Sequence, residues 1–362
     1  MAGFEGVEWA PHQMRYLLND KKFDIMEASA KVSAVSRSIH YALFLVFEGI
    51  RFFCSENEKG ELEAVFLNWD KNLARFQKGM AFNLSNSQQH LVPDIDELEE
   101  LFIQNYFKHP TMREFFEGMA RTNAQGYLRP YTVDEEQSIG VTFPVDPSIR
   151  AVVCSYDRYL GEPFSGVSIP NLVRVIGINR TGCLKLGINY LMSIKAVDEA
   201  RKIHPDAATA LFLDDKIHLR LEDRVITEWD SSCCLFAFRD GNVLKIPESP
   251  LILPSVTIIG AVAVLKKMGV PVTEKDISYG ELVEKVRSNE LVAACSIGTA
   301  GILNRCEELV LVNRANEILV THHPDENHEL FRILGDIRTY YWDIYQGSAD
   351  VPDGIKLFRY VL

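Results

Sequence analysis

The sequence predicts a mixed α/β (α+β) chain that folds as two domains, and three observations lead to this prediction. The chain has 362 residues, of which 47% are hydrophobic, so it is long enough to bury a large core in about two domains. Segments with strand-like and helix-like periodicity are mixed in both halves. A short segment with Gly and Pro, residues 161–168, is the expected linker between a small N-terminal domain (1–160) and a larger C-terminal domain (169–362).

In the N-terminal half, residue alternation and amphipathic spacing define the expected elements. Residues 62–69 alternate like a strand and lead into a helix over 70–80. Residues 94–107 have apolar positions at helical spacing and an acidic first turn, which suits the positive end of the helix dipole. Residues 150–155 are expected to form the last strand before the linker.

In the C-terminal half, turn residues and end signals separate the expected elements. A strand is expected at 172–178, a helix at 186–203, a strand at 210–214 and a hairpin at 235–246 that turns at Asp240-Gly241. Pro254-Ser255 opens a further helix. The apolar body of that helix ends in two lysines and Gly269, which are typical of a helix C-terminus.

Composition narrows the classes of partner and location. There are 38 Lys and Arg against 50 Asp and Glu, giving a formal charge of −12, and this excess of negative charge disfavours nucleic acid and anionic membrane surfaces as partners. The apolar runs are far shorter than the roughly 20 residues of a membrane span. The first residues lack the features of an export signal. The seven cysteines include no Cys-x-x-Cys pair, so reduced thiols and a cytoplasmic location are expected.

Several familiar catalytic signatures are missing from the sequence. It contains no Gly-x-x-x-x-Gly-Lys, no Gly-x-Gly-x-x-Gly, no His-Glu-x-x-His and no Gly-x-Ser-x-Gly. Nucleotide-binding, zinc-hydrolase and serine-esterase functions therefore lose their main support, and no metal ligand set is expected.

One ordered set of segments does point to chemistry. It comprises Lys185–Tyr190, Thr227–Ser232, Leu253–Thr257 and Ser296–Ala300. Lys185 stands at the start of an apolar helical segment, and Glu228 follows a β-branched strand. The start of the helix at 256 and the small-residue turn at 296–301 can both offer backbone N–H groups to an anion. Taken singly, each feature also has an ordinary explanation, such as an exposed lysine or a structural salt bridge.

Taken together and in this order, these segments resemble the class IV (fold type IV, D-amino-acid-aminotransferase-like) pyridoxal-phosphate aminotransferases, and within them the branched-chain amino-acid aminotransferases. The first half adds to the resemblance. Ala30–Tyr41 and Val46–Arg51 are similar to the family's opening strands, Asn72–Phe76 to the helix that bears the phosphate arginine, and Tyr127–Pro130 to the substrate-binding turn. The resemblance extends from about residue 24 to Gly347.

The resemblance implies pyridoxal 5'-phosphate as the cofactor. Lys185 would carry it as a Schiff base and move the proton at the substrate α-carbon, while Glu228 would face the ring nitrogen and keep it protonated. Tyr190 would bind the ring hydroxyl. The phosphate would be held by four further residues: Arg75, Val256, Thr257 and Thr299.

The resemblance also implies transamination between branched-chain, aliphatic L-amino acids and 2-oxoglutarate or glutamate. Arg129 would meet the distal carboxylate of the acidic partner. The other substrate-binding residues implied are Tyr41, Phe47 and Tyr159 as apolar walls, and Tyr127 with the Thr299 and Ala300 N–H groups for the α-carboxylate. Because the family builds its pocket partly from the neighbouring subunit, a homodimer is expected.

The sequence departs from the family pattern close to this chemistry. Ile188 and Trp229 stand where the family usually has glycine, and Ser255 and Ile258 stand where the phosphate helix usually has glycine and arginine. Because packed interiors have little spare volume, the indole and the isoleucine are expected to narrow or reshape the cavity.

Three alternatives remain open. The first keeps the fold and changes the reaction to that of a D-amino-acid transaminase or an aminodeoxychorismate-lyase-like enzyme, although the Tyr127–Pro130 segment favours the branched-chain type. The second is a pyridoxal-phosphate-binding protein with little turnover. The third is a thiol enzyme that uses Cys295 or Cys306 with a histidine such as His40, and the spacing of these residues gives it no support.

Overall fold

The computed structural model describes residues 3–162, 164–175, 177 and 181–362. They form two compact units. The large unit contains Tyr159–Cys183 and Asn189–Ile355, and the small unit contains Phe4–Arg158, Leu184–Ile188 and Lys356–Leu362. Each unit has its own sheet and its own helices, so the predicted mixed α/β fold class is confirmed.

The small unit is built on an eight-stranded sheet in which every recorded strand pair is antiparallel. In sheet order, the strands are β19 (Leu357–Val361), β6 (Leu62–Leu67), β5 (Ile50–Glu56), β7 (Gln125–Asp134), β8 (Pro147–Tyr156), β3 (His12–Leu17) and β4 (Lys22–Glu27), with β2 (Glu8–Trp9) paired to β8. The strands expected at 62–69 and 150–155 are therefore confirmed as β6 and β8.

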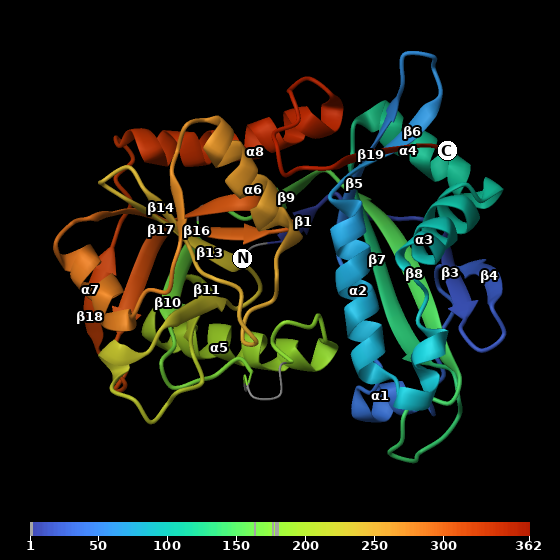
Figure 1. Ribbon diagram of the computed structural model, residues 1–362, viewed down its shortest axis with the longest axis horizontal. Coiled ribbons are helices and arrows are strands. Elements are labelled where there is room, and N and C mark those ends of the chain that lie inside the picture. The colour runs from blue at the N-terminus through green and yellow to red at the C-terminus, as the bar shows by residue number, and fades with distance from the viewer. Residues whose placement is uncertain (1–2, 163, 176, 178–180) are drawn as a thin grey trace. The chain divides into compact units, whose positions relative to one another are not determined.

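The helices of the small unit lie in the segments of the chain between these strands (Figure 1). They are α1 (Arg37–Tyr41), α2 (Trp69–Asn83), η1 (Asn86–Leu91), α3 (Ile95–Glu99), η2 (Glu100–Phe107), η3 (Pro110–Met112) and α4 (Arg113–Thr122). The helix expected at 70–80 is confirmed as α2. The helix expected at 94–107 has the predicted acidic first turn, and the Asp94 side chain caps it by accepting a hydrogen bond from the N–H of Glu97. The second half of this segment, η2, is a π-helix.

The large unit is built on a nine-stranded mixed sheet. In sheet order, the strands are β12 (Ile226–Trp229), β11 (Ala207–Leu213), β10 (Phe164–Ser168), β17 (Ile302–Val312), β16 (Leu291–Gly298), β13 (Cys233–Phe238), β14 (Val243–Lys245) and β15 (Val272–Glu274), with β18 (Ile318–His322) paired to β17. Strand β10 is parallel to both of its neighbours. Two short strands, β1 (Gly3–Glu5) and β9 (Arg158–Leu160), complete the set.

Helices cover both faces of this sheet, as Figure 1 shows, with α5 on one side and α6 and α8 on the other. The helices of the large unit are α5 (Tyr190–Ile203), η6 (Leu221–Asp223), α6 (Val256–Lys267), α7 (Tyr279–Arg287) and α8 (Glu329–Gln346). The short helix η5 (Gly187–Asn189) comes immediately before α5 in the chain. Small residues let α5 lie close to the sheet, because Ala196 and Ala200 pack into one buried cluster with Phe212 and Val310.

Most elements expected in the C-terminal half are confirmed. The hairpin β13–β14 turns at Asp240-Gly241, where Gly241 has a φ of +88° that favours glycine. Ser255 caps α6 by accepting a hydrogen bond from the N–H of Ile258, and Gly269 follows that helix with a φ of +79°.

Three expectations about local structure are wrong. Residues 172–175 and 177 are not in a strand, while 176 and 178 lie outside the described residues. Within the expected linker, Phe164–Ser168 form the inner strand β10 rather than a connecting turn. Residues 37–41 form the short helix α1, so the segment 30–41 is not an opening strand. The placing of the domain boundary at 161–168 stays a prediction.

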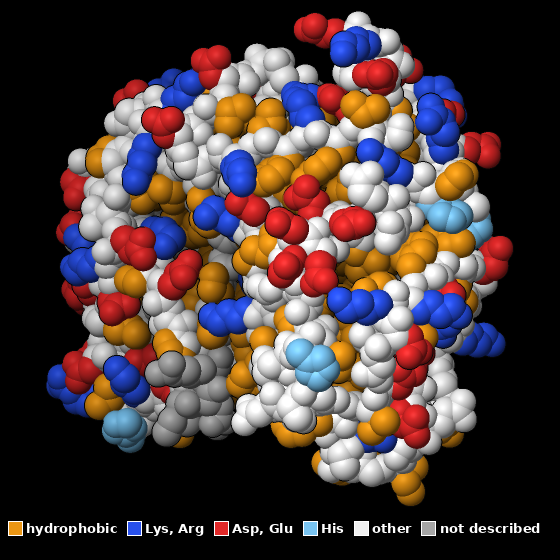
Figure 2. Space-filling view, turned by 45° about the vertical axis from the view of Figure 1, so that its right-hand side comes forward, with side chains coloured by type: hydrophobic (Ala, Val, Ile, Leu, Met, Phe, Trp, Pro, Cys, Tyr) orange, Lys and Arg blue, Asp and Glu red, His pale blue; other side chains and the backbone are white. Residues whose placement is uncertain are grey.

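The hydropathy of the helices and the distribution of surface charge can be compared with what the composition predicts. None of the helices in the described part of the chain is both long and apolar enough to cross a membrane. On the face drawn in Figure 2, Lys and Arg side chains lie scattered among Asp and Glu side chains.

The buried imidazole of His322, at the end of β18, predicts a loss of stability in mild acid. Burial, with smaller contributions from His323 and Arg239, lowers the pKa of His322 from 6.5 to about 4. Because the unfolded chain then binds a proton that the folded chain excludes, the stabilisation is complete above about pH 6.5 and is lost as the pH falls towards 4. Through this group alone, the free energy of unfolding should be about 2 kcal/mol lower at pH 5 than at pH 7.5.

Urea unfolding of His322→Gln and wild type at these two pH values measures this effect. The variant should lose less stability than the wild type on acidification. The exposed His90 provides the matched control, and His90→Gln should keep the wild-type difference. An equal loss in His322→Gln and wild type would contradict the assignment.

Candidate active site

Lys185 lies in a short extended segment of the small unit that is fixed by backbone hydrogen bonds. The Phe47 N–H donates to the Lys185 carbonyl at 3.1 Å, and Val46 and Leu186 form an isolated antiparallel bridge. Helix α5 begins only at Tyr190, so the expectation that Lys185 starts this helix is wrong. Its half-buried side chain places Nζ 4.9 Å from the centre of the Phe47 ring.

Three of the expected substrate-binding residues lie together beside Lys185. The Arg129 guanidinium carbon lies 4.8 Å from the centre of the Phe47 ring, and Arg129 Nη2 donates a hydrogen bond of 2.8 Å to the Tyr127 hydroxyl. A Cβ atom added to Gly49 would lie 2.0 Å from that hydroxyl, so only glycine fits under Tyr127. The segment Tyr127–Pro130 lies inside strand β7 and is not a turn.

Arg75, the arginine expected at the phosphate, lies on α2 and is held by a buried carboxylate. Its Nε and Nη2 both bond to Glu48, at 2.6 and 2.5 Å, in a two-point ion pair. The Glu48 side chain is fully buried and also accepts a hydrogen bond from the Gly49 N–H. A phosphate at Arg75 would therefore share this guanidinium with Glu48.

The other two expected wall residues, Tyr41 and Tyr159, have recorded contacts of their own. Tyr41, at the end of α1, is 43% exposed, and its hydroxyl donates to the Ile139 carbonyl at 2.9 Å. Tyr159 belongs to the large unit and lies on β9, where its carbonyl accepts a hydrogen bond from Arg338.

In the large unit, Glu228 lies inside β12 with only 3% of its surface exposed. Arg174 Nη2 lies 2.5 Å from Glu228 Oε1. The same carboxylate oxygen accepts a hydrogen bond of 3.4 Å from the backbone N–H of Leu253. Leu253 lies three residues before helix α6. The acid and the beginning of the candidate phosphate helix are therefore neighbours within one unit.

The second candidate phosphate-binding feature is the turn Thr299–Gly301 between β16 and β17. The hydroxyls of Ser232 and Ser296 lie 2.7 Å apart, which connects the residue before β13 to β16 near this turn. Ile302 follows the turn with a φ of +62°, a strained conformation for a β-branched residue. Strain of this kind costs about 1–3 kcal/mol and gathers at ligand sites.

The remaining predicted cofactor residues lie at element ends in the same unit. Tyr190 begins α5 and is half-buried. Val256 and Thr257 form the first turn of α6, where backbone N–H groups have no acceptor within the helix. The Ser255 hydroxyl takes only the third of these N–H groups, that of Ile258.

The bulky departure Trp229 does not lie beside Glu228, because neighbouring residues of a strand point to opposite faces. The indole is fully buried, packs edge-on against Phe164 and donates to the Cys295 carbonyl at 3.0 Å. The indole fills the core at Gly166, where a Cβ would lie 2.6 Å from the ring, and its effect on the cofactor cavity stays a prediction.

The other departures have different surroundings. Ile188 is 62% exposed, whereas Ile258 is buried in the first half of α6. Neither the exposed nor the buried isoleucine has a recorded contact with Glu228, and the effect of both on the cavity stays a prediction.

The thiol alternative finds no chemical support. Burial raises the pKa of Cys295 above its ordinary value and that of Cys306 to about 12, so both stay protonated at neutral pH. Thiolate nucleophiles require the opposite environment.

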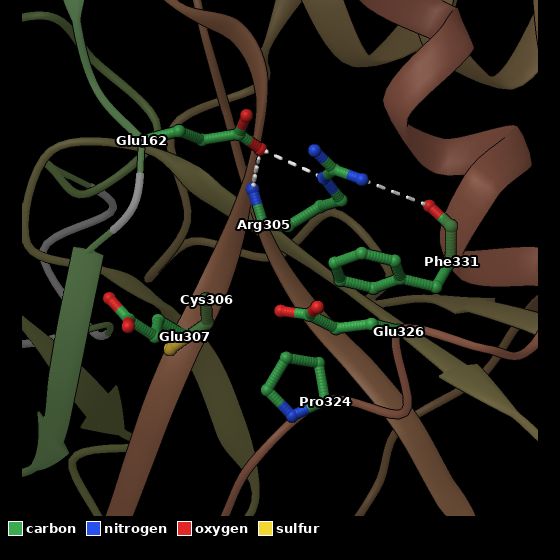
Figure 3. A pocket seen from close by; sticks show the side chains of 7 residues that line it. All are labelled: Glu162, Arg305, Cys306, Glu307, Pro324, Glu326 and Phe331. Atoms are coloured by element: carbon green, nitrogen blue, oxygen red, sulfur yellow. Dashed lines mark hydrogen bonds and ion pairs between the residues drawn. The ribbon is translucent and has the colours of Figure 1, made fainter.

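A separate hollow of the large unit, of about 490 Å³, has a different chemistry. Figure 3 shows Arg305 between Glu162, which accepts hydrogen bonds from its backbone N–H and its Nε, and Phe331, whose carbonyl accepts from Nη1. Glu307 and Glu326 also line it. With three glutamates and an arginine that is already paired, this hollow does not suit a phosphate.

Each unit, taken by itself, contains groups of the kind that pyridoxal phosphate requires. The large unit brings together a buried acid, a helix N-terminus and a strained turn of small residues. The small unit contains a lysine amine and a paired arginine. Sequence reasoning missed two members, Arg174 and Glu48. Each is a charged residue within an apolar segment, and that pattern is itself a signal of a buried partner.

Comparison with known proteins gives the relationship of this chain. No family model matches it. It is 25% identical over 332 residues to a probable branched-chain-amino-acid aminotransferase of Staphylococcus aureus, covering 90% of this chain and 84% of that protein. It is 24% identical over 336 residues to the branched-chain-amino-acid aminotransferase of Helicobacter pylori, covering 87% and 89%. Over most of its length, the chain is therefore similar to branched-chain aminotransferases as a distant homologue.

Solved structures of branched-chain aminotransferases have the same fold. The enzyme of Thermoproteus uzoniensis, solved with norvaline, matches with a TM-score of 0.67 at 20% identity, covering 96% of this chain and 99% of that one. The Thermobaculum terrenum enzyme in its PLP form matches with a TM-score of 0.66 at 18% identity, covering 97% and 99%. The predicted fold type IV architecture is therefore confirmed.

Proposed function

We propose that this chain is a pyridoxal-phosphate-dependent aminotransferase that moves amino groups between branched-chain, aliphatic L-amino acids and 2-oxoglutarate or glutamate. One observation carries the proposal. The Lys185 amine and the Arg129 guanidinium both lie within 5 Å of the centre of the same Phe47 ring, at 4.9 and 4.8 Å. The amine that would bind the cofactor and the cation that would bind a substrate carboxylate therefore both lie next to the same apolar ring.

Pyridoxal phosphate, when bound, supplies an aldehyde that condenses with amines and a ring that delocalises the electrons of the substrate α-carbon. Lys185 holds the cofactor and then moves the proton at the α-carbon. Glu228 accepts the N–H of the ring nitrogen, and Tyr190 binds the ring hydroxyl. Arg75, Thr299 and the N–H groups of Val256 and Thr257 hold the phosphate.

The substrate residues must accept an apolar side chain and a carboxylate at the same place. Phe47, with Tyr41 and Tyr159, forms apolar walls for the aliphatic side chain. Arg129 binds the distal carboxylate of the acidic substrate, and its guanidinium lies over the face of the Phe47 ring. Tyr127, with the Thr299 and Ala300 N–H groups, binds the α-carboxylate.

The proposal extends to a cytoplasmic homodimer. The segment 139–145 exposes Ile139, Val141, Phe143 and Val145 by 53–74%, and exposed apolar groups of this kind favour association. No disulfide is recorded for the seven cysteines, all of which lie in the described part of the chain, and this suits a reducing compartment. A monomeric mass in solution would contradict the dimer.

A screen of amino donors against 2-oxoglutarate tests the proposed reaction. Leucine, isoleucine and valine should give glutamate and their 2-oxo acids with the highest kcat/KM. Transfer from D-amino acids, or a lyase reaction without amino transfer, would replace the proposal with another class IV activity. A cofactor-loaded protein that transfers nothing would contradict an enzymatic role.

Arg129→Gln should separate the two substrate classes. Loss of a charge-assisted hydrogen bond of about 1.5–3 kcal/mol should raise the KM for 2-oxoglutarate by about 10-fold or more, because only this substrate has a second carboxylate. The KM for leucine should change by less than about threefold. Steady-state kinetics with each substrate varied in turn measures both values.

Arg121→Gln provides the control, since Arg121 is an exposed arginine near the end of α4 in the same unit. It should leave both KM values unchanged. An equal rise for leucine and 2-oxoglutarate in Arg129→Gln would mean that Arg129 supports the fold of the site and does not select the acidic substrate.

A further inference from the structure

The buried guanidinium of Arg174 contacts the candidate cofactor acid directly. Arg174 Nη2 lies 2.5 Å from Glu228 Oε1, and the two side chains are 7% and 4% exposed. A carboxylate this deeply buried is costly unless a cation and hydrogen bonds compensate it. Among the recorded neighbours of Glu228 in the large unit are Arg174 and the thiol of Cys234 on β13, whose pKa is raised well above its ordinary value by burial. Arg174 is thus a cation that compensates Glu228 there.

Arg174 also connects the two segments that lead into the chemistry. Its Nη2 donates to the Gly182 carbonyl at 3.0 Å and to the Leu251 carbonyl at 3.4 Å. Gly182 precedes Lys185 by three residues, and Leu251 precedes helix α6 by five. The two segments touch, because a Cβ on Gly182 would lie 2.4 Å from the Pro250 carbonyl oxygen.

We propose that Arg174 is a positioning residue that keeps Glu228 ionised and aimed for the cofactor ring nitrogen. The inference rests on the proposed function, since the acid matters to the reaction only if the cofactor binds. A neighbouring cation favours the carboxylate over the carboxylic acid, and only the carboxylate can accept the ring N–H without first losing a proton. The hydrogen bonds to two carbonyls fix the direction from which the guanidinium approaches.

Arg174→Gln should therefore cause a loss of rate that depends on pH. Without the cation, the buried Glu228 should take up a proton near neutral pH. The resulting fall in kcat should be about 10–100-fold, the range found when a residue that orients a ligand-binding side chain is replaced. Raising the pH to about 9 should ionise Glu228 again, so kcat of Arg174→Gln should be about threefold or more higher than at neutral pH. Glu228→Gln has no such proton to lose, so its rate loss should be the same across this range.

The experiment measures kcat and the visible absorption spectrum of the cofactor-loaded wild type, Arg174→Gln and Glu228→Gln from about pH 6 to about pH 9. The spectrum of Arg174→Gln should change with pH through this range, and that of Glu228→Gln should not. A support role without positioning predicts a loss that is equal at every pH and an unchanged spectrum. That outcome would overturn the inference.

Arg224→Gln is the matched control, because Arg224 is a fully buried arginine of the same unit whose Nε lies 3.1 Å from Asp214 Oδ1. It should lower the stability of the protein without producing a pH-dependent rate or spectrum. If Arg174→Gln does not fold, Arg174→Lys keeps the charge and should retain a wild-type pH profile with a smaller loss of kcat. An alkaline shift in Arg174→Lys as well would overturn the inference.

Borohydride labelling of the wild-type protein distinguishes failure of the proposed function from failure of the role of Arg174. If borohydride leaves no pyridoxyl group on the wild-type protein, the cofactor assignment fails. If the wild type is labelled and active but Arg174→Gln shows no pH-dependent loss, only the role of Arg174 fails.

Discussion

Lys185→Ala should abolish transamination and the colour change that accompanies cofactor binding. The side chain supplies the only amine at Phe47 that the described contacts record, with Nζ 4.9 Å from the ring centre. Because the proton at the substrate α-carbon would have no positioned acceptor, kcat should fall by at least about a thousandfold, within the range that general acid–base catalysis contributes. Single-turnover kinetics with leucine and absorption spectra after addition of the cofactor measure the two effects.

The control for this variant is Lys195→Ala, an exposed lysine of α5 ten residues further along the chain. It should retain the rate and the colour change. The stability of Lys185→Ala should differ from wild type by less than about 1 kcal/mol, because the side chain is only half-buried. A Lys185→Ala protein that still turns over leucine at the wild-type rate would refute the assignment of Lys185.

Glu48→Gln should cause the largest loss of stability among the site variants. The Glu48 carboxylate is fully buried and binds Arg75 at two points, at 2.6 and 2.5 Å. Neutralising it leaves a buried guanidinium without its charge partner, which should lower the free energy of unfolding by about 3 kcal/mol. The affinity for pyridoxal phosphate should fall as well, because the orientation of Arg75 is no longer fixed.

Urea unfolding and cofactor titration measure these two consequences. Glu56→Gln is the matched control, since Glu56 is an exposed glutamate at the end of β5, and it should change stability by less than about 0.5 kcal/mol. If Glu48→Gln were as stable as Glu56→Gln, the pair with Arg75 would contribute nothing to the fold.

Elements with strong local signals could be predicted from the sequence alone. The Ser255 cap and the Lys266, Lys267 and Gly269 ending define α6 through interactions within one or two turns. The turn at Asp240-Gly241 is equally local, because a glycine at positive φ determines it. Such features depend on short-range chemistry, which one sequence contains in full.

Elements whose form depends on distant partners could not be predicted. The lysine segment reads as a helix start, yet its backbone pairs with Val46 and Phe47, about 140 residues away. The apolar segment 172–178 reads as a strand, but Arg174 in its middle is drawn to Glu228 and to two carbonyls. Tertiary contacts override local propensity in both cases.

The identities of the candidate residues followed from the resemblance, whereas their supports required coordinates. The direction of Trp229 is set by the alternation of β12, whose register with β11 the sequence does not reveal. The partners of Arg75 and Glu228 are 27 and 54 residues away in the chain, and no short motif relates them.

Peptide mapping after borohydride reduction is the most direct test of the central claim, which is that Lys185 is the residue that binds pyridoxal phosphate. The account predicts one pyridoxyl group per chain, on the peptide that contains Lys185. A reduced protein with no such group on that peptide, or with the group on another lysine, would contradict it.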